Sequence, residues 1–237
     1  MIVRNLQLVR DRITTACIAA GRNPASVRLL AVSKTCPAGA VMNAMAGGQR
    51  MFGENYITEG VEKIIALQAV QENSSVEASD RLEWHCIGPV QSNKTRLVAE
   101  NFHWVQSVDR LKIAQRLNEQ RPAHLPPLQI CLQINIDGGI NKSGVEPGDL
   151  MALVTDVAQL ARLKVRGLMT IPEPAINFEA ACAVYDKAKA IFDQINASGV
   201  LPVPMDTLSM GMTHDLEAAI HSGSTMVRVG TAIFGAR

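Results

Sequence analysis

The sequence predicts an α/β protein, a single closed (β/α)₈ barrel over residues 1–237, and three observations lead to this prediction. Short apolar segments typical of strands alternate with amphipathic helical segments along the whole chain. Eight such strand–helix units in 237 residues match the usual size of this barrel. Largely apolar strands such as Leu128–Ile136 are expected to be covered on both faces, as parallel strands are.

The individual elements follow from hydrophobic periodicity, beginning with a helix at residues 2–20. Its apolar side chains are three and four residues apart, and Gly21 is a natural residue to end it. Because this helix precedes the first strand, we expect it to close the bottom of the barrel or to supply the eighth outer helix. We predict strands at 28–33, 50–53, 82–87, 103–106, 128–135, 163–169, 206–209 and 225–229. We predict the later helices at 38–47, 55–68, 93–101, 109–120, 148–160, 177–197 and 213–221.

An open doubly wound sheet is the alternative fold. Such a sheet would be expected to carry a Gly-rich dinucleotide-binding turn after its first strand. The turn here is Ser33–Pro37, which has no GxGxxG pattern. No Pro/Ser-rich linker divides the chain, and the polar stretch Gln71–Arg81 is expected to be a surface loop. The barrel is therefore favoured.

The composition excludes several classes of protein. Lys and Arg number 23 and Asp and Glu 22, and this net charge of +1 argues against a nucleic-acid or membrane-surface partner. The five cysteines are scattered and lack a CxxC pair, which indicates reduced thiols in a cytoplasmic protein. The sequence has no signal peptide and no apolar run of about 18 residues. Its histidines lack metal-ligand spacing, so no metal site is expected.

The sequence lacks a complete P-loop for nucleotide binding and a nucleophile elbow for acyl chemistry. Gly88–Thr95 is similar to a P-loop, but Asn93 replaces the second glycine and Pro89 has no N–H to offer a phosphate. The Gly-x-Ser-x-Gly pattern of a nucleophile elbow is absent from the sequence. Nucleotide hydrolysis and serine-based hydrolysis are therefore not expected.

Lys34 is the first candidate functional residue, because polar groups at the carboxyl ends of barrel strands face the mouth where chemistry takes place. Leu30, Val32 and Lys34 share one face of the first strand. An ammonium at the end of an apolar face is costly unless it is neutral or has a partner. A desolvated lysine is the usual Schiff-base nucleophile. The alternative is a lysine that simply reaches solvent at the end of its strand.

Arg228 is the second candidate. It shares a face of the last strand with Met226 and Gly230, so its guanidinium points either into the barrel or into the helix layer. Arginine remains charged and needs an acceptor. A structural ion pair is one possible acceptor, and a ligand nitrogen or phosphate is the other. The glycine and threonine that follow favour the ligand.

The loops after strands seven and eight are the third candidate, because many barrels bind phosphate there. Ser209 and Gly211 follow strand seven, and Gly230 and Thr231 follow strand eight. Each loop offers a small hydroxyl beside a glycine, where backbone N–H groups can approach an anion closely. The two loops together predict a phosphate site.

Six blocks of sequence, in order along nearly the whole chain, carry a family resemblance. They are Ala31–Thr35, Phe52–Tyr56, Trp84–Lys94, Gly167–Met169, Leu208–Met212 and Val227–Gly235. In these blocks the chain resembles the pyridoxal phosphate (PLP) homeostasis protein family. That family is similar in fold to the N-terminal barrel domain of alanine racemase, the fold type III barrel of PLP enzymes.

The resemblance implies that PLP lies at the barrel mouth as an internal aldimine on Lys34. It implies that Arg228 faces the pyridine nitrogen and that residues of the last two loops hold the phosphate. Cys36 departs from the family, whose members often have a second lysine at this position. The residues expected to bind the cofactor are Lys34, Asn55, His85, Met169, Ser209, Gly211, Arg228, Gly230 and Thr231.

Two functions from different classes are compatible with the resemblance. The first is a PLP-binding protein of intracellular PLP homeostasis, which buffers the cofactor or delivers it to apo PLP-dependent enzymes and so affects amino-acid and keto-acid balance. The second is a PLP-dependent amino-acid racemase or decarboxylase of the same fold. A barrel with interaction functions only is disfavoured, because it would not explain a mouth lysine facing two phosphate-type loops.

Acid–base chemistry favours the homeostasis function, with no robust turnover. Racemisation needs an acid/base group on each face of the substrate carbon, and Lys34 is the one evident base. Neither Tyr56 nor Tyr185 has a strong claim to the opposite face. The second β domain, which supplies this group and the dimer contacts in type III enzymes, is expected to be absent, so we expect a monomer. An arginine at the ring nitrogen would make the ring a poor electron sink, which disfavours transamination most.

Overall fold

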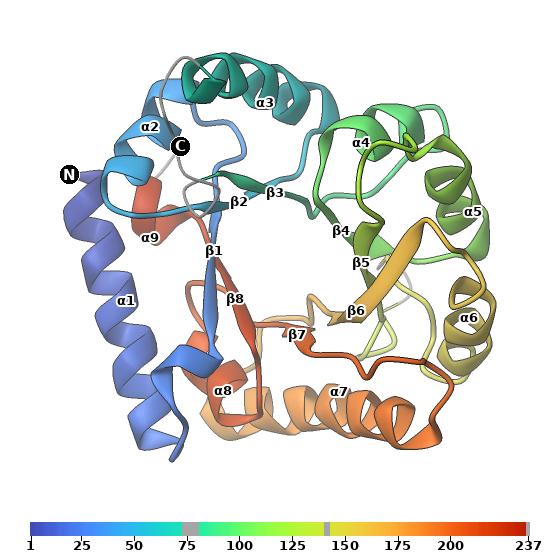
Figure 1. Cartoon of the computed structure of the whole chain (residues 1–237). Coiled ribbons are helices and arrows are strands. Elements are labelled where there is room, and N and C mark those ends of the chain that lie inside the picture. The colour runs from blue at the N-terminus through green and yellow to red at the C-terminus, as the bar shows by residue number, and fades with distance from the viewer. Residues whose placement is uncertain (73–80, 140–142, 236–237) are drawn as a thin grey trace.

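The strands form a closed parallel barrel in the order β1-β2-β3-β4-β5-β6-β7-β8, and β1 pairs with β8 to complete it (Figure 1). This computed structural model describes residues 1–72, 81–139 and 143–235. Each pair of neighbouring strands is parallel, and Leu30 of β1 lies beside Arg228 of β8. Closure through this last pair confirms the predicted barrel and excludes the open sheet.

All eight predicted strands are confirmed, with ends that move by up to two residues. The fourth strand begins one residue later than expected, at Trp104. It ends two residues later than expected, at Val108. The strands are β1 (Arg28–Val32), β2 (Met51–Glu54), β3 (Glu83–Cys86), β4 (Trp104–Val108), β5 (Leu128–Gln133), β6 (Leu163–Met169), β7 (Thr207–Ser209) and β8 (Met226–Val229).

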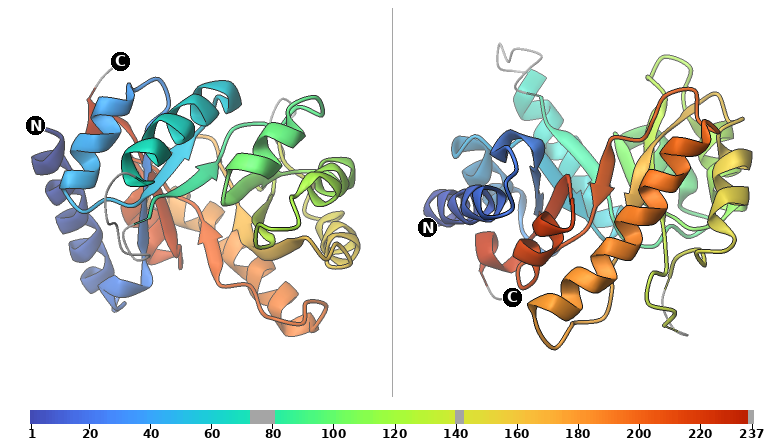
Figure 2. Two further views of the ribbon diagram at one scale, coloured as in Figure 1. Left: turned by 45° about the horizontal axis from the view of Figure 1, so that its top comes forward. Right: turned by 90° about the horizontal axis from the view of Figure 1, so that it is seen from below.

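Helices surround the strands on the outside of the barrel, as the views in Figure 2 show. The sequence did not predict the short helix α9 after the last strand or the 3₁₀ turn at Pro24–Ser26. Residues 71–72 of the expected polar loop end α3, and 73–80 lie outside the described residues. The α-helices are α1 (Ile2–Ala19), α2 (Ala38–Ala46), α3 (Ile57–Glu72), α4 (Thr95–Asn101), α5 (Leu111–Gln120), α6 (Leu150–Val157), α7 (Phe178–Ser198), α8 (Leu216–His221) and α9 (Thr231–Phe234).

The N-terminal helix α1 supplies the eighth outer helix. It packs against α2, α8 and α9, beside the β1–β8 seam, at the left of Figure 1. This position confirms one of the two expected roles, and the helix does not close the bottom of the barrel. Its buried face consists of Leu6, Val9, Ile13, Ala16 and Cys17, the three- and four-residue spacing that the sequence predicted.

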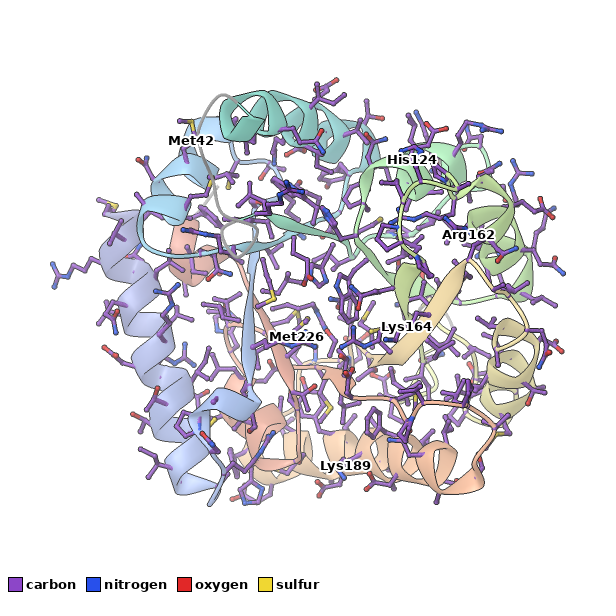
Figure 3. The ribbon with its side chains drawn as sticks, in the orientation of Figure 1. Met42, His124, Arg162, Lys164, Lys189 and Met226 are labelled. Carbon is purple, nitrogen blue, oxygen red and sulfur yellow. The ribbon has the colours of Figure 1, made fainter. Side chains whose placement is uncertain are left out.

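Two small apolar clusters lie inside the barrel, separate from the main core between the strands and the outer helices. Figure 3 shows the Met226 side chain pointing toward the centre of the barrel. The first cluster consists of Leu30, Val32, Ile87 and Met226. The second consists of Trp104, Cys131 and Met169.

No helix in the described part of the chain is long and apolar enough to cross a membrane. Over the same residues, no three His, Cys, Asp or Glu side chains are grouped so that they could hold a metal ion. The five cysteines are free thiols and are buried.

Candidate functional site

A pocket of about 240 Å³ opens at the carboxyl ends of the strands. Residues in or directly after six different strands meet there, because parallel strands of a barrel all end at the same face. The lining consists of Val32, Lys34, Asn55, Ile87, Ile171, Met212, Thr213, His214, Arg228, Gly230 and Thr231.

The lining combines positive charge with apolar surface. Lys34, Arg228 and His214 are basic side chains, and no carboxylate belongs to the lining among the described residues. Such a pocket attracts an anion. Its apolar part suits a flat ring and is made of Val32, Ile87, Ile171 and Met212.

Lys34 lies in a tight turn directly after β1. The N–H of Cys36 donates to the carbonyl of Ser33 (3.0 Å), so Lys34 is the first of the two central residues of the turn. Its side chain is half-buried and lines the pocket. Its Nζ makes no hydrogen bond or ion pair with any residue that the structure describes. The amine is therefore available to a ligand.

Arg228 points into the barrel, which decides between the two directions that the sequence allowed. Its side chain is 3% exposed. Nη1 donates to Ser209 Oγ (2.7 Å) and Nη2 donates to the carbonyl of Thr170 (2.8 Å). Burial lowers the pKa of Arg228, yet a guanidinium stays protonated at neutral pH. None of its described hydrogen-bond partners is a carboxylate, so its charge is available to an anionic or electron-rich ligand.

A chain of buried hydrogen bonds continues from Arg228 through the barrel. Ser209 Oγ donates to Gln106 Oε1 (2.7 Å), and Gln106 Nε2 lies 2.9 Å from His85 Nδ1. His85 Nε2 lies 2.8 Å from Glu83 Oε1. Because the amide oxygen of Gln106 accepts from Ser209, its NH₂ donates to His85 Nδ1. This leaves the proton of His85 on Nε2, where it donates to Glu83.

The charges at the two ends of this chain are opposite. Burial lowers the pKa of His85, which is neutral inside the barrel. Burial alone would raise the pKa of Glu83, but His85, Trp104 and Arg28 together lower it to about 2. At neutral pH the chain therefore joins a guanidinium beneath the pocket to a carboxylate at the start of β3 through neutral groups. This arrangement holds the guanidinium in one position.

Two of the predicted cofactor contacts lie deeper than expected. His85 is fully buried and stacks on Trp104, with ring centroids 5.1 Å apart. Met169 packs in the second interior cluster. Each lies two residues before a residue that does line the pocket, Ile87 or Ile171. Since side chains two apart share a face of a strand, His85 and Met169 are one layer below the mouth. Neither residue belongs to the described pocket lining, and their contact with a cofactor stays a prediction.

Ser209 and Gly211 also lie outside the described pocket lining, and their contact with a cofactor stays a prediction. Both hydrogen-bonding roles of the Ser209 hydroxyl are taken inside the barrel, by Gln106 and Arg228, so it supports the arginine instead of facing the pocket. Gly211 has φ +91°, and an added Cβ would collide with the side chain of Ala219. Its carbonyl accepts from the N–H of Arg228 (3.0 Å). Both residues therefore hold Arg228 in place, Ser209 through the side chain and Gly211 through the backbone.

The remaining predicted residues do meet in the pocket. Lys34, Asn55, Arg228, Gly230 and Thr231 all belong to its lining. The two loops that were expected to hold a phosphate also come together, although through a different hydroxyl on the first loop. Thr213 Oγ1, after β7, lies 3.4 Å from Thr231 Oγ1, after β8.

Sequence reasoning missed other residues of the site. Gln106 could have been suspected, because its polar side chain lies in a strand segment that begins with Trp104 and Val105 and ends with Val108. Ile87 and Ile171 could have been predicted as well, because they lie two residues after His85 and Met169 and so share a face of the chain with them. The loop residues Thr213 and His214 have no such signal, since loops lack a periodicity that would show which side chains face inward.

A barrel with a lysine at its mouth and an arginine beneath it defines a class, that of the alanine racemase N-terminal domain. The model of the family "Alanine racemase, N-terminal domain" matches residues 5–237. An alanine racemase of Clostridium difficile 630 superposes with a TM-score of 0.69 at 16% identity, over 99% of this chain and 57% of that one. At this identity the similarity concerns the fold.

Relatives of higher identity define the family within this class. The chain is 53% identical over 236 residues to the pyridoxal phosphate homeostasis protein of Pseudomonas aeruginosa, covering 100% of this chain and 96% of the relative. It is 50% identical over 237 residues to that of Escherichia coli K12, covering 100% and 97%. The structure of PipY of Synechococcus elongatus with PLP bound superposes with a TM-score of 0.81 at 33% identity, over 99% and 100% of the two chains. The chain belongs to the pyridoxal phosphate homeostasis protein family.

Proposed function

We propose that this protein binds PLP in the mouth pocket, covalently through Lys34, and that it buffers the cofactor and passes it to apo PLP-dependent enzymes. The observation that carries the proposal is the half-buried Lys34 amine, free of described partners, in a basic pocket without a described carboxylate. PLP is an aromatic aldehyde with a phosphate, and each part of it has a counterpart in this lining.

The residues present fit the three parts of the cofactor. Val32, Ile87 and Ile171 provide apolar surface for the ring. The loops with Thr213 and Thr231 provide hydroxyls for the phosphate, and Arg228 is held where it can face the ring nitrogen. PLP supplies an aldehyde that condenses with amines. Lys34 Nζ would form the bond to the aldehyde carbon with loss of one water, and an incoming amine would replace Lys34 on that carbon and release the lysine as a free amine.

The same residues favour a carrier over an amino-acid racemase or decarboxylase. A second acid/base group opposite Lys34 would be needed for racemisation. Tyr56 is 58% exposed, and Tyr185 is buried with its hydroxyl donating to Asp215 (2.7 Å). Neither tyrosine belongs to the described lining, and His214 is on an exposed loop. Arg228 would leave the ring nitrogen unprotonated, which weakens electron withdrawal by the cofactor and disfavours transamination more than racemisation.

The covalent bond is tested on the purified holo-protein. We expect a visible absorption band that borohydride removes, and a pyridoxyl label on the peptide that contains Lys34. Lys34→Ala should abolish the label, because no other amine lines the described pocket. Lys94→Ala is the matched control, since its amine contacts Thr58 on the surface. A label that stays in the Lys34→Ala variant would refute the assignment.

The distinction between carrier and enzyme is tested by turnover and transfer. Holo-protein is incubated with D- and L-alanine, serine, lysine and ornithine, and enantiomers and amines are quantified. It is also mixed with an apo PLP enzyme in the presence of a trap for free PLP. We expect negligible turnover together with reactivation of the apoenzyme. Rapid, saturable racemisation or decarboxylation would instead establish the enzyme, and failure to reactivate would reduce the role to buffering.

A further inference from the structure

The turn that presents Lys34 is held on both sides by a cluster of charged residues, of which Glu54 and Lys63 are buried and Glu59 is partly exposed. This cluster consists of Glu54 at the end of β2 and of Glu59 and Lys63 on α3. It contacts both neighbours of Lys34, namely Ser33 and Thr35. It lies outside the pocket lining, so it has no contact with a ligand there.

Lys63 is the centre of the cluster. Its side chain is nearly buried, and its Nζ lies 2.7 Å from the carbonyl of Ser33, 2.8 Å from Glu54 Oε1 and 2.6 Å from Glu59 Oε1. The ammonium thus uses all three donors. One of them holds the carbonyl that also closes the Lys34 turn.

Glu59 holds the other side of the turn. Its Oε1 accepts from the backbone N–H of Thr35 (2.6 Å). Thr35 has φ +61° and is the one non-glycine residue with positive φ in the described part of the chain. Threonine is branched at Cβ, so this conformation is strained. The carboxylate of Glu59 compensates for the strain by fixing the N–H of the residue next to Lys34.

Glu54 adds a second unfavourable feature at the same place. Its Oε1 accepts from Ser33 Oγ (2.6 Å), but Oε2 is buried without a hydrogen-bond partner among the described residues. Burial raises the pKa of Glu54, and Lys63 and Ser33 partly offset this effect. Buried charges with an unpaired oxygen stabilise a fold poorly. Strained backbone next to such a group is typical of a functional constraint.

We propose that Glu59 and Lys63, with Glu54 behind them, are positioning residues that set the direction of the Lys34 side chain for its bond to the cofactor. The proposal rests on the proposed function of Lys34. A turn released from the cluster would relax Thr35 toward negative φ, which rotates the backbone at Lys34. The pocket itself would keep its loops, its arginine and its apolar surface.

Two ligands separate positioning of Lys34 from general damage to the pocket. PLP can bond to Lys34, whereas pyridoxine 5′-phosphate has an alcohol in place of the aldehyde and binds without the covalent bond. We expect Glu59→Ala to weaken PLP binding by about tenfold, the equivalent of one hydrogen bond to a charged group. Its affinity for pyridoxine 5′-phosphate should be unchanged. Both dissociation constants are measured by titration of apo-protein, and a thermal melt verifies folding.

Three further variants make the test specific. Glu59→Gln keeps an acceptor for the Thr35 N–H and should restore most of the PLP affinity. Thr35→Gly combined with Glu59→Ala should do the same, because glycine adopts positive φ without strain. Glu62→Ala is the matched control, since Glu62 is exposed on the same helix and has no hydrogen bond or ion pair with a described residue. It should change neither affinity.

The outcomes are distinct. Equal losses for both ligands in Glu59→Ala, or no rescue by glycine at position 35, would overturn the positioning role while leaving the proposed function intact. A wild-type protein that binds PLP and pyridoxine 5′-phosphate equally, with no borohydride label on Lys34, would instead overturn the proposed function.

Discussion

Replacement of Arg228 by methionine is expected to weaken PLP binding by about tenfold to a hundredfold and to lower the free energy of unfolding by about 1–3 kcal/mol. Methionine fills a similar volume but removes the positive charge beneath the pocket. It also leaves the buried carbonyl of Thr170 without its donor and Ser209 without one of its two partners. The binding loss comes from the charge, and the stability loss comes from the unpaired buried acceptors.

Two control variants separate these effects. Arg228→Lys keeps the charge but cannot reach two acceptors with a planar fork, so it should recover binding only in part. Arg96→Met removes an arginine that pairs with Glu100 on the exposed surface of α4, and it should leave PLP binding unchanged. PLP titration and urea unfolding measure the two quantities. An Arg228→Met protein with wild-type PLP affinity would show that the guanidinium does not contact the cofactor.

Gly167→Ala is expected to destabilise the barrel by about 4 kcal/mol or more, a large part of the stability of a typical domain. An added Cβ at Gly167 would collide with the backbone carbonyl of Thr207. These two residues are register partners in the β6–β7 pair, so relief of the collision requires the strands to separate. We expect insoluble protein or a much lower urea midpoint.

Gly39→Ala is the matched control for this variant. Gly39 lies in the first turn of α2, and an added Cβ meets no atom within 4 Å. Alanine is a better helix former than glycine, so this change should raise stability by up to about 1 kcal/mol. If Gly167→Ala were as stable as Gly39→Ala, the close approach of β6 and β7 would not explain the glycine.

Features that depend on local sequence pattern could be predicted before the structure was known. Each strand was recognised from a short apolar run, because burial on both faces leaves a clear mark on composition. Lys34 and Arg228 were chosen as candidates because a charge at the end of such a run is costly unless it has a partner, and the structure places both in the pocket lining. The loops after strands seven and eight were expected to hold a phosphate, and this role stays a prediction. In the structure Ser209 is bonded to Arg228, and Thr213 Oγ1 lies near Thr231 Oγ1.

By itself, the sequence determined the succession of strands and helices, the barrel they close and the lysine at its mouth, since these depend on periodicity and burial along the chain. Only the tertiary structure decided which side chains meet inside the barrel. Gln106 and Ser209 are 103 residues apart and touch because of the stagger between strands. The hydrogen bond from Thr35 to Glu59 likewise depends on the packing of α3 against β2. Such contacts across the fold leave no pattern in a single sequence, because each partner alone is an ordinary polar residue.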